Sequence, residues 1–382
     1  MLTSELDFPL PPELIAQQPA RPRSSARLLH LMRAKGSTPF RGCVAHRSIL
    51  DLPDLLRKGD LLVFNDTRVL RARLHGKKPS GGRVEALLLR EQSRNVWEAL
   101  LKPSSRLKVG GEVYFHAPGD ENNSIKTTLL ERHEESWKLQ FHPPDQKDIR
   151  DCLTDFGEIP IPPYIKTAPQ EGEYQTVYAQ TRAQNSMTQS DAGSALDSSA
   201  APTAGLHFTP ELLASLRERG VQTAFVTLGV GVGTFRPIQT QTLEEHAMHE
   251  EEFFVSRETA SAINAQKQNG NRIVAVGTTT TRVLESIADA NGMITEGAGH
   301  TSIFIKPGHH FRCVDALLTN FHLPRSTLIA LVAAFVEDGL IRAENDRATT
   351  ELTGLEIVRY AYGQAIAEKY RFFSFGDAML IE

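Results

Sequence analysis

Three mostly apolar runs in the second half of the chain are each followed by small and polar residues. The runs are residues 221–228, 272–276 and 314–319, and glycine or asparagine comes next in each case. Runs of this kind are typical of strands that are buried on both faces of a parallel sheet. Because parallel strands present their carboxyl ends at one edge, the pattern predicts that the three following loops lie together there, where α/β folds bind ligands.

Helix signals separate these strands. Thr209 and Ser256 suit the N-cap positions of two helices, and Gly220 and Gly270 suit the left-handed position that ends each of them. An apolar helix is predicted at residues 328–336, after the third loop. Alternating strands and helices predict a layered α/β main domain.

A different pattern begins near residue 66. Short runs of alternating polarity follow one another at close spacing, separated by glycine-containing turns, which predicts a small antiparallel β-barrel or sandwich. We therefore expect a main domain in two segments, residues 1–65 and 151–382, with an inserted antiparallel β-barrel domain at residues 66–150. Residues 181–200 are rich in Ser, Gln, Asn and Ala without apolar periodicity, which predicts a mobile surface loop.

Composition and charge exclude several classes of protein. The 382 residues include 42 Lys and Arg against 46 Asp and Glu, so any contact with nucleic acid must use a local basic patch. The cysteines, Cys43, Cys152 and Cys313, are too far apart to support a disulfide framework or a zinc cluster. Without a signal-peptide pattern or an apolar run long enough to span a bilayer, we expect a cytoplasmic protein with no membrane partner.

Histidines and a carboxylate stand among the predicted edge loops. His207 and His322 belong to two different loops and could converge there as proton carriers, whereas a single loop histidine is more often solvated. Asp66 follows a strand at the domain junction, where a turn cap and an anchoring carboxylate fit the sequence equally well.

Three further features each have two interpretations. Arg68 and Arg71 open a basic run at the entry to the barrel, which is either a solvated strand face or an RNA contact. His246 and His249 have metal-ligand spacing if they are helical, but an acidic helix face is the simpler interpretation. Residues 370–377 combine four aromatic rings with an aspartate, which suits a cationic ligand or a flat base, or else core packing.

Five long motifs occur in the order of a known family, at residues 60–69, 201–208, 276–279, 315–327 and 370–378. Through them the chain resembles, over nearly its whole length, the S-adenosylmethionine:tRNA ribosyltransferase-isomerases of queuosine biosynthesis. The resemblance implies an α/β domain with an inserted antiparallel barrel. It also implies transfer of the ribosyl part of S-adenosylmethionine onto 7-aminomethyl-7-deazaguanine at the wobble position of tRNA. Epoxyqueuosine in tRNA, adenine and methionine would be the products. The implied partners are tRNA and S-adenosylmethionine as co-substrate, without a metal or prosthetic group, and we expect a monomer.

This chemistry suggests roles for the candidate residues. His207 and His322 would share proton transfers, and Asp66 or Asp377 would face the sulfonium. The residues expected to contact substrate are Arg68, Arg71, Thr203, Gly205, His249, Thr278, Thr279, Arg282, Lys306, Asn320, Arg371 and Asp377. Among these, the threonines and the asparagine would orient it, and Arg282, Lys306 and Arg371 would hold the methionine carboxylate or a tRNA phosphate. Gly229 stands where the family usually has histidine, so either that histidine is dispensable or a neighbour such as His249 substitutes for it.

Two other classes of protein stay open at this point. A nucleotide-dependent oxidoreductase would explain the three α/β units, but the glycines at 229, 231 and 233 do not have the spacing of the dinucleotide-binding loop. A non-catalytic RNA-binding protein would explain the basic barrel entry but not the His, Thr and Arg residues of the edge loops.

Overall fold

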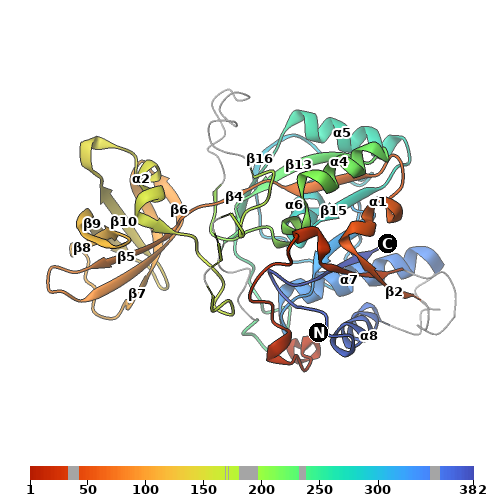
Figure 1. Ribbon diagram of the computed structural model, residues 1–382, viewed down its shortest axis with the longest axis horizontal. Coiled ribbons are helices and arrows are strands. Elements are labelled where there is room, and N and C mark those ends of the chain that lie inside the picture. Colours follow the sequence, from red (N-terminus) through yellow and green to blue (C-terminus); the bar gives the residue numbers. More distant parts are fainter. Residues whose placement is uncertain (33–42, 168, 171, 180–196, 232–237, 345–352) are drawn as a thin grey trace. The chain divides into compact units, whose positions relative to one another are not determined.

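The computed structural model describes residues 1–32, 43–167, 169–170, 172–179, 197–231, 238–344 and 353–382. The chain forms two compact units, which Figure 1 shows. The main unit consists of Met1–Arg68, Pro163–Leu196 and Pro202–Glu382, and the barrel unit consists of Val69–Pro162 and Asp197–Ala201.

In the part of the chain that the structure describes, a mixed sheet of nine strands forms the centre of the main unit. In spatial order the strands are β16 (Gly297–Thr301), β14 (Glu251–Val255), β13 (Gln222–Leu228), β3 (Leu61–Asn65), β15 (Ile273–Val276), β17 (Ala316–Asn320), β18 (Ala378–Ile381), β1 (Arg27–Leu31) and β2 (Val44–Ser48). Strands β13, β3, β15 and β17 are parallel to one another, and the strands that flank this group, β14 and β18, are antiparallel to it. The predicted common edge of three parallel strands is therefore confirmed.

Helices cover the sheet. They are α1 (Leu52–Leu55), α4 (Pro210–Glu218), α5 (Arg257–Gln268), α6 (Thr278–Ile287), α7 (Thr327–Glu344) and α8 (Gly354–Ala367), with the 3-10 helices η1 (Thr3–Leu6), η2 (Pro12–Leu14), η3 (Arg23–Ser25), η4 (Ile49–Asp51) and η6 (Thr203–His207). The predicted caps are confirmed, because Thr209 accepts a hydrogen bond from the Leu212 amide and Ser256 from the Thr259 amide. One core lies where Leu212 and Leu216 of α4 pack on strand residues such as Phe64.

The two edges of the parallel strands differ in chemistry. At the amino edge, Arg272 forms ion pairs with Asp60, at 2.6 Å, and with Glu382. These hydrogen-bonded charges hold the starts of β3 and β15 beside the end of β18. The opposite edge, where these parallel strands end, is called the carboxyl edge below, and it carries the candidate site.

The barrel unit is a closed antiparallel barrel, which confirms the predicted barrel rather than a sandwich. Its strands, in order around the barrel, are β5 (Arg73–Lys77), β6 (Arg83–Ser93), β7 (Val96–Lys102), β10 (Trp137–His142), β9 (Asp120–Arg132) and β8 (Glu112–Ala117), and β8 pairs again with β5. Gly76 sits at this closure, where a Cβ would lie 2.5 Å from the Tyr114 carbonyl oxygen. Short strands β4 (Arg68–Val69), β11 (Gly157–Glu158) and β12 (Asp197–Ser198), the 3-10 helix η5 (Pro144–Gln146) and helix α2 (Ile149–Phe156) complete the described elements of this region.

The bounds of the barrel unit differ from the predicted 66–150. The unit continues to Pro162 because α2 buries Ile149, Leu153 and Phe156 in the barrel core. It also includes residues 197–201, since the Leu70 amide donates to the Ser198 carbonyl at 2.9 Å.

The predicted mobile loop at 181–200 lies mostly outside the described residues. Its last part is described, and Ser198, Ser199 and Ala200 are buried, so the surface-loop prediction does not hold for them. The preceding segment, from Tyr174 to Ala179, is a series of turns and bends. Among the described helices, none has both the length and the apolar character needed to cross a membrane.

Candidate active site

Residues from six strands meet at the carboxyl edge of the main sheet. Asp66 follows β3, Thr278 follows β15, and Asn320 ends β17. Strand β18 starts at this edge because Ala378 pairs with Asn320, and β1 starts there too because Leu28 pairs with Ala378. The sixth strand, β13, ends at Leu228, beside the end of β3. Helix η6 contacts the end of β17 and brings His207 to this edge.

His207 and Asn320 form the centre of the site. The Asn320 amide Nδ2 lies 3.3 Å from His207 Nε2 and donates to the Phe373 carbonyl at 3.1 Å. Since an amide nitrogen only donates, Nε2 acts as the acceptor and the imidazole proton is on Nδ1. Burial lowers the pKa of His207 to about 4, although the charge of Asp377 acts in the opposite direction. His207 is therefore neutral at pH 7, with a donor at Nδ1 and with Nε2, the nitrogen that could take up a proton, hydrogen-bonded to Asn320.

Two glycines near η6 are explained by different requirements. Gly277 has a φ of 93°, which favours glycine, whereas a Cβ there would make only ordinary contact, at 3.6 Å, with Ala204 Cβ and Thr279 Oγ1. At Gly205 a Cβ would lie 2.0 Å from the Tyr178 hydroxyl oxygen, so no other residue fits without displacing Tyr178. The small residues of the sequence motif are thus explained by close packing around the site.

Asp66 is a buried carboxyl group beside β13. Its Oδ1 accepts a 2.7 Å hydrogen bond from the Thr227 hydroxyl. Burial raises the pKa of Asp66 to about 6, and the Thr227 hydrogen bond partly opposes this shift. The preceding Asn65 fixes the end of β13, because its Oδ1 accepts from the Leu228 amide at 3.0 Å and its Nδ2 donates to the Leu228 carbonyl at 3.2 Å. Asp66 is therefore a firmly placed carboxyl that can change protonation near neutral pH.

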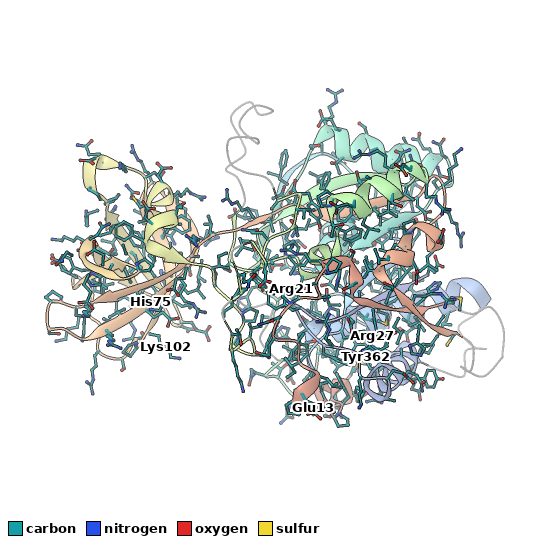
Figure 2. The ribbon with its side chains drawn as sticks, viewed as in Figure 1. Glu13, Arg21, Arg27, His75, Lys102 and Tyr362 are labelled. Carbon is teal, nitrogen blue, oxygen red and sulfur yellow. The ribbon has the colours of Figure 1, made fainter. Side chains whose placement is uncertain are left out.

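His322 is buried, but the structure does not bring it to His207. Its Nε2 lies 3.2 Å from the Thr319 hydroxyl, and Nδ1 lies 3.5 Å from the hydroxyl of Tyr362, which Figure 2 labels. Thr319 and Asn320 are successive residues of β17, so their side chains point to opposite faces of the sheet. The two histidines are thus held on different faces of the sheet. Among the described residues no contact joins them, so the structure does not show the predicted convergence of two proton carriers.

Neutral, buried histidines make stability depend on pH. The pKa of His322 is lowered by burial from 6.5 to about 3, and that of His207 to about 4. As the pH falls, both imidazoles are protonated in the unfolded chain before they are protonated in the folded one. Their contribution to the free energy of unfolding is therefore complete above pH 6.5 and is lost as the pH falls through the pKa values of the folded state. We expect the urea midpoint of unfolding to fall between about pH 6.5 and 4, and less steeply for His322→Gln. An unchanged pH slope in this variant would contradict the assignment.

Asp377 has several protein partners, and its predicted role at the sulfonium stays a prediction. Its Oδ1 accepts from the Arg27 amide at 3.1 Å and from Arg371 Nη2 at 3.3 Å, and its Oδ2 accepts from the Arg371 amide at 2.8 Å. Arg27, labelled in Figure 2, also pairs with Oδ2 at 3.4 Å and lies over the Tyr370 ring. Asp377 therefore positions two arginines, and Arg371 is partly engaged by it.

Arg282 and Lys306 also have protein partners. Arg282 Nη1 forms an ion pair with Glu251, and the two side chains are only 4% and 5% exposed. Arg282 Nε donates to the Ile303 carbonyl at 3.3 Å. The ion pair gives Arg282 a structural role, and its predicted contact with a substrate anion stays a prediction. Lys306 lies 3.5 Å from Glu244 in an exposed pair.

The other predicted contact residues are divided between the units. Thr203 opens η6, and Thr278 and Thr279 are buried at the start of α6. Arg68 is exposed at the end of the main-unit segment, whereas Arg71 belongs to the barrel unit and donates to the Thr154 carbonyl at 2.7 Å. His249 is exposed, and residues 246–249 lie outside any helix, so neither the helical metal pair nor the acidic helix face predicted for this segment holds. Within the described ranges, no group of three or more His, Cys, Asp or Glu side chains is placed to hold a metal ion.

Sequence reasoning missed two hydroxyl residues that approach η6. Thr176 and Tyr178 lie against Gly205. Their segment is held by Arg23, which donates to the Gln175 carbonyl at 2.7 Å and to the Gly172 carbonyl. No spacing in the sequence connects residue 176 or 178 with residue 205, so only the tertiary structure reveals them.

This edge brings a neutral imidazole, an amide, a titratable carboxyl and several hydroxyls together on an α/β sheet, a set of groups typical of an enzyme active site. The family described as "Queuosine biosynthesis protein" matches residues 3–381. The S-adenosylmethionine:tRNA ribosyltransferase-isomerase of Caldanaerobacter subterraneus is 45% identical over 383 residues, which cover 100% of both chains. The enzyme of the same name from Nostoc sp. is 44% identical over 98% of this chain and 90% of its own.

A solved structure extends the likeness to three dimensions. The crystal structure of S-adenosylmethionine tRNA ribosyltransferase from Thermotoga maritima is 35% identical, covers 99% of this chain and 100% of its own, and has a TM-score of 0.52. The chain belongs to the S-adenosylmethionine:tRNA ribosyltransferase-isomerase family of queuosine biosynthesis. The oxidoreductase and the non-catalytic RNA-binding protein have no support from these comparisons.

Proposed function

We propose that this protein transfers and isomerises the ribosyl group of S-adenosylmethionine onto 7-aminomethyl-7-deazaguanine at the wobble position of tRNA. The products are epoxyqueuosine in tRNA, adenine and methionine. The observation that carries the proposal is the likeness of 44–45% identity, over essentially the full length, to enzymes named for this activity. The buried His207–Asn320 pair at the carboxyl edge supports it with suitable acid–base groups. The proposal includes a monomer that acts in the cytoplasm.

The reaction needs proton transfers and displacements. The sulfonium makes the adjacent ribosyl carbon acidic, so a base removes its proton and adenine leaves with help from a proton donor. The uncharged amine of the tRNA base then attacks the ribosyl fragment, and methionine leaves as the epoxide closes. Acid–base groups and oriented donors suffice for these steps, and each contributes roughly 10²- to 10⁴-fold in rate. We therefore propose that no metal or prosthetic group takes part.

Each central residue has a role within this scheme. His207 is neutral at pH 7 and takes part in proton transfer; Asn320 holds its ring through Nε2, and His207 accepts a proton there when substrate binding frees this nitrogen from Asn320. Asp66, with a pKa of about 6, is mostly ionised at pH 7 and places a negative charge beside the sulfonium. Thr203, Thr278 and Thr279 orient the ribosyl group.

The test is adenine release by the purified protein. We expect free adenine when S-adenosylmethionine is supplied together with tRNA carrying 7-aminomethyl-7-deazaguanine, in a ratio of one adenine per epoxyqueuosine formed. Matched tRNA with unmodified guanine, and S-adenosylmethionine alone, are the controls and should give none. Binding of the modified tRNA without adenine release would instead favour a binding module, and nicotinamide-dependent absorbance change would favour an oxidoreductase.

A further inference from the structure

Four buried polar atoms without a protein partner lie around η6. In the described part of the chain, they are Thr176 Oγ1, the Tyr178 hydroxyl, Thr279 Oγ1 and Asn320 Oδ1, and other such atoms lie in the barrel unit. Buried polar groups are normally hydrogen-bonded, because an unpaired one loses its hydration without replacement. Several such atoms around one short helix are therefore a sign of a ligand that supplies the missing partners.

Thr176 and Tyr178 converge on the same point of η6. A Cβ at Gly205 would lie 2.0 Å from the Tyr178 oxygen and 3.0 Å from Thr176 Cγ2. Thr176 is 6% exposed, and although the Tyr178 ring is only partly buried, its hydroxyl oxygen is fully buried. The glycine thus makes room for the hydroxyl, and both side chains come from a segment to which the sequence motifs of the site give no role.

The surroundings of these hydroxyls fit a nucleoside better than a phosphate. The Tyr178 ring packs 4.8 Å from Phe64 and 5.5 Å from Phe225, centroid to centroid, which gives an apolar aromatic surface. Burial raises the pKa of the Tyr178 hydroxyl, and the negative charge of the Asp66 carboxyl raises it further, so this carboxyl acts on the hydroxyl and would repel an anion. Arg23, which anchors the segment, directs its guanidinium to the backbone carbonyls of Gly172 and Gln175. A neutral base and ribose, attached to a cationic sulfonium, match aromatic rings, hydroxyls and a carboxyl.

We propose that Thr176 and Tyr178 bind the nucleoside part of S-adenosylmethionine, with their hydroxyls hydrogen-bonded to its ribose or base. The inference rests on the proposed function for the identity of the donor. It adds the segment at residues 172–179 to the substrate-binding site and explains why residue 205 is glycine.

The test removes only the hydroxyl groups. Tyr178→Phe and Thr176→Val are expected to leave the thermal unfolding midpoint unchanged, because neither hydroxyl has a protein partner. Each is expected to raise the KM for S-adenosylmethionine, and its Kd measured by calorimetry without tRNA, by roughly 2- to 10-fold, as the loss of one hydrogen bond predicts. The KM for tRNA should stay the same. Thr127→Val is the matched control, since Thr127 Oγ1 is also buried without a partner but lies in strand β9 of the barrel, and it should change none of these values.

Three outcomes would overturn the inference. An unchanged KM and Kd for S-adenosylmethionine in both variants would show that these hydroxyls do not contact it. A rise in the KM for tRNA alone would assign them to the tRNA base instead, and a clear drop in the unfolding midpoint would show a structural role. Failure of the proposed function is a separate result, because it would appear as absence of adenine release by the unaltered protein.

Discussion

Replacing His207 with alanine is expected to lower the turnover number for adenine release by about 10²- to 10⁴-fold, the usual contribution of a general acid or base. The physical reason is that burial keeps this imidazole neutral, with a pKa of about 4, while Asn320 fixes its orientation. Steady-state kinetics with saturating S-adenosylmethionine and modified tRNA measure the effect. The thermal unfolding midpoint, recorded alongside, separates loss of chemistry from loss of fold.

A matched histidine variant controls for the substitution itself. His300 is 52% exposed and lies 3.7 Å from Glu250 on the surface, so His300→Ala should leave turnover unchanged. Full turnover in His207→Ala, and in the double variant that also carries His322→Ala, would show that proton transfer does not depend on these imidazoles. Loss of turnover in His322→Ala alone, with His207 present, would show that the residue on the other face of β17 carries the chemistry.

Replacing Arg282 with methionine is expected to lower the free energy of unfolding by roughly 3–5 kcal/mol, because it leaves the buried Glu251 carboxylate without its countercharge. This expectation follows from the nearly complete burial of both side chains, 4% and 5% exposed. The change can be measured by urea unfolding of the purified variant. The double variant Arg282→Met with Glu251→Leu should recover much of the loss, since both charges are then absent.

The surface pair Arg219–Asp54 provides the comparison. Its side chains are 60% and 68% exposed, so Arg219→Met should change stability little. If Arg282→Met instead folded with normal stability and raised only the KM for S-adenosylmethionine, Arg282 would be the anion-binding residue that the sequence suggests.

The sequence predicts the parts of this structure that depend on neighbouring residues. Thr209 and Ser256 cap their helices because an N-cap side chain binds amides two or three residues ahead. The three strand ends converge because apolar runs alternate with helices, and right-handed parallel connections bring their carboxyl ends to one edge. The barrel is also predicted from neighbouring residues, because its strands appear as short runs of alternating polarity at close spacing.

The parts that depend on distant pairs could not be predicted in this way. Glu251 neutralises Arg282 across 31 positions, and Asp377 meets Arg27 across 350, and nothing local specifies which opposite charge a buried residue will contact. The sequence therefore suggests ligand-binding arginines where the fold has ion pairs. His322 illustrates a second limit, because one step along β17 reverses the face on which a side chain lies. Tyr178 illustrates a third, since only the packing against Gly205 reveals it.

The central claim is that S-adenosylmethionine binds at the carboxyl edge around η6. Hydrogen–deuterium exchange of the free protein and of the protein saturated with S-adenosylmethionine tests it most directly. The account predicts slower exchange in peptides that cover residues 203–208 and 276–282, and unchanged exchange at the amino edge, in peptides that cover Asp60 and Arg272. Slower exchange at the amino edge, with no change around η6, would contradict it.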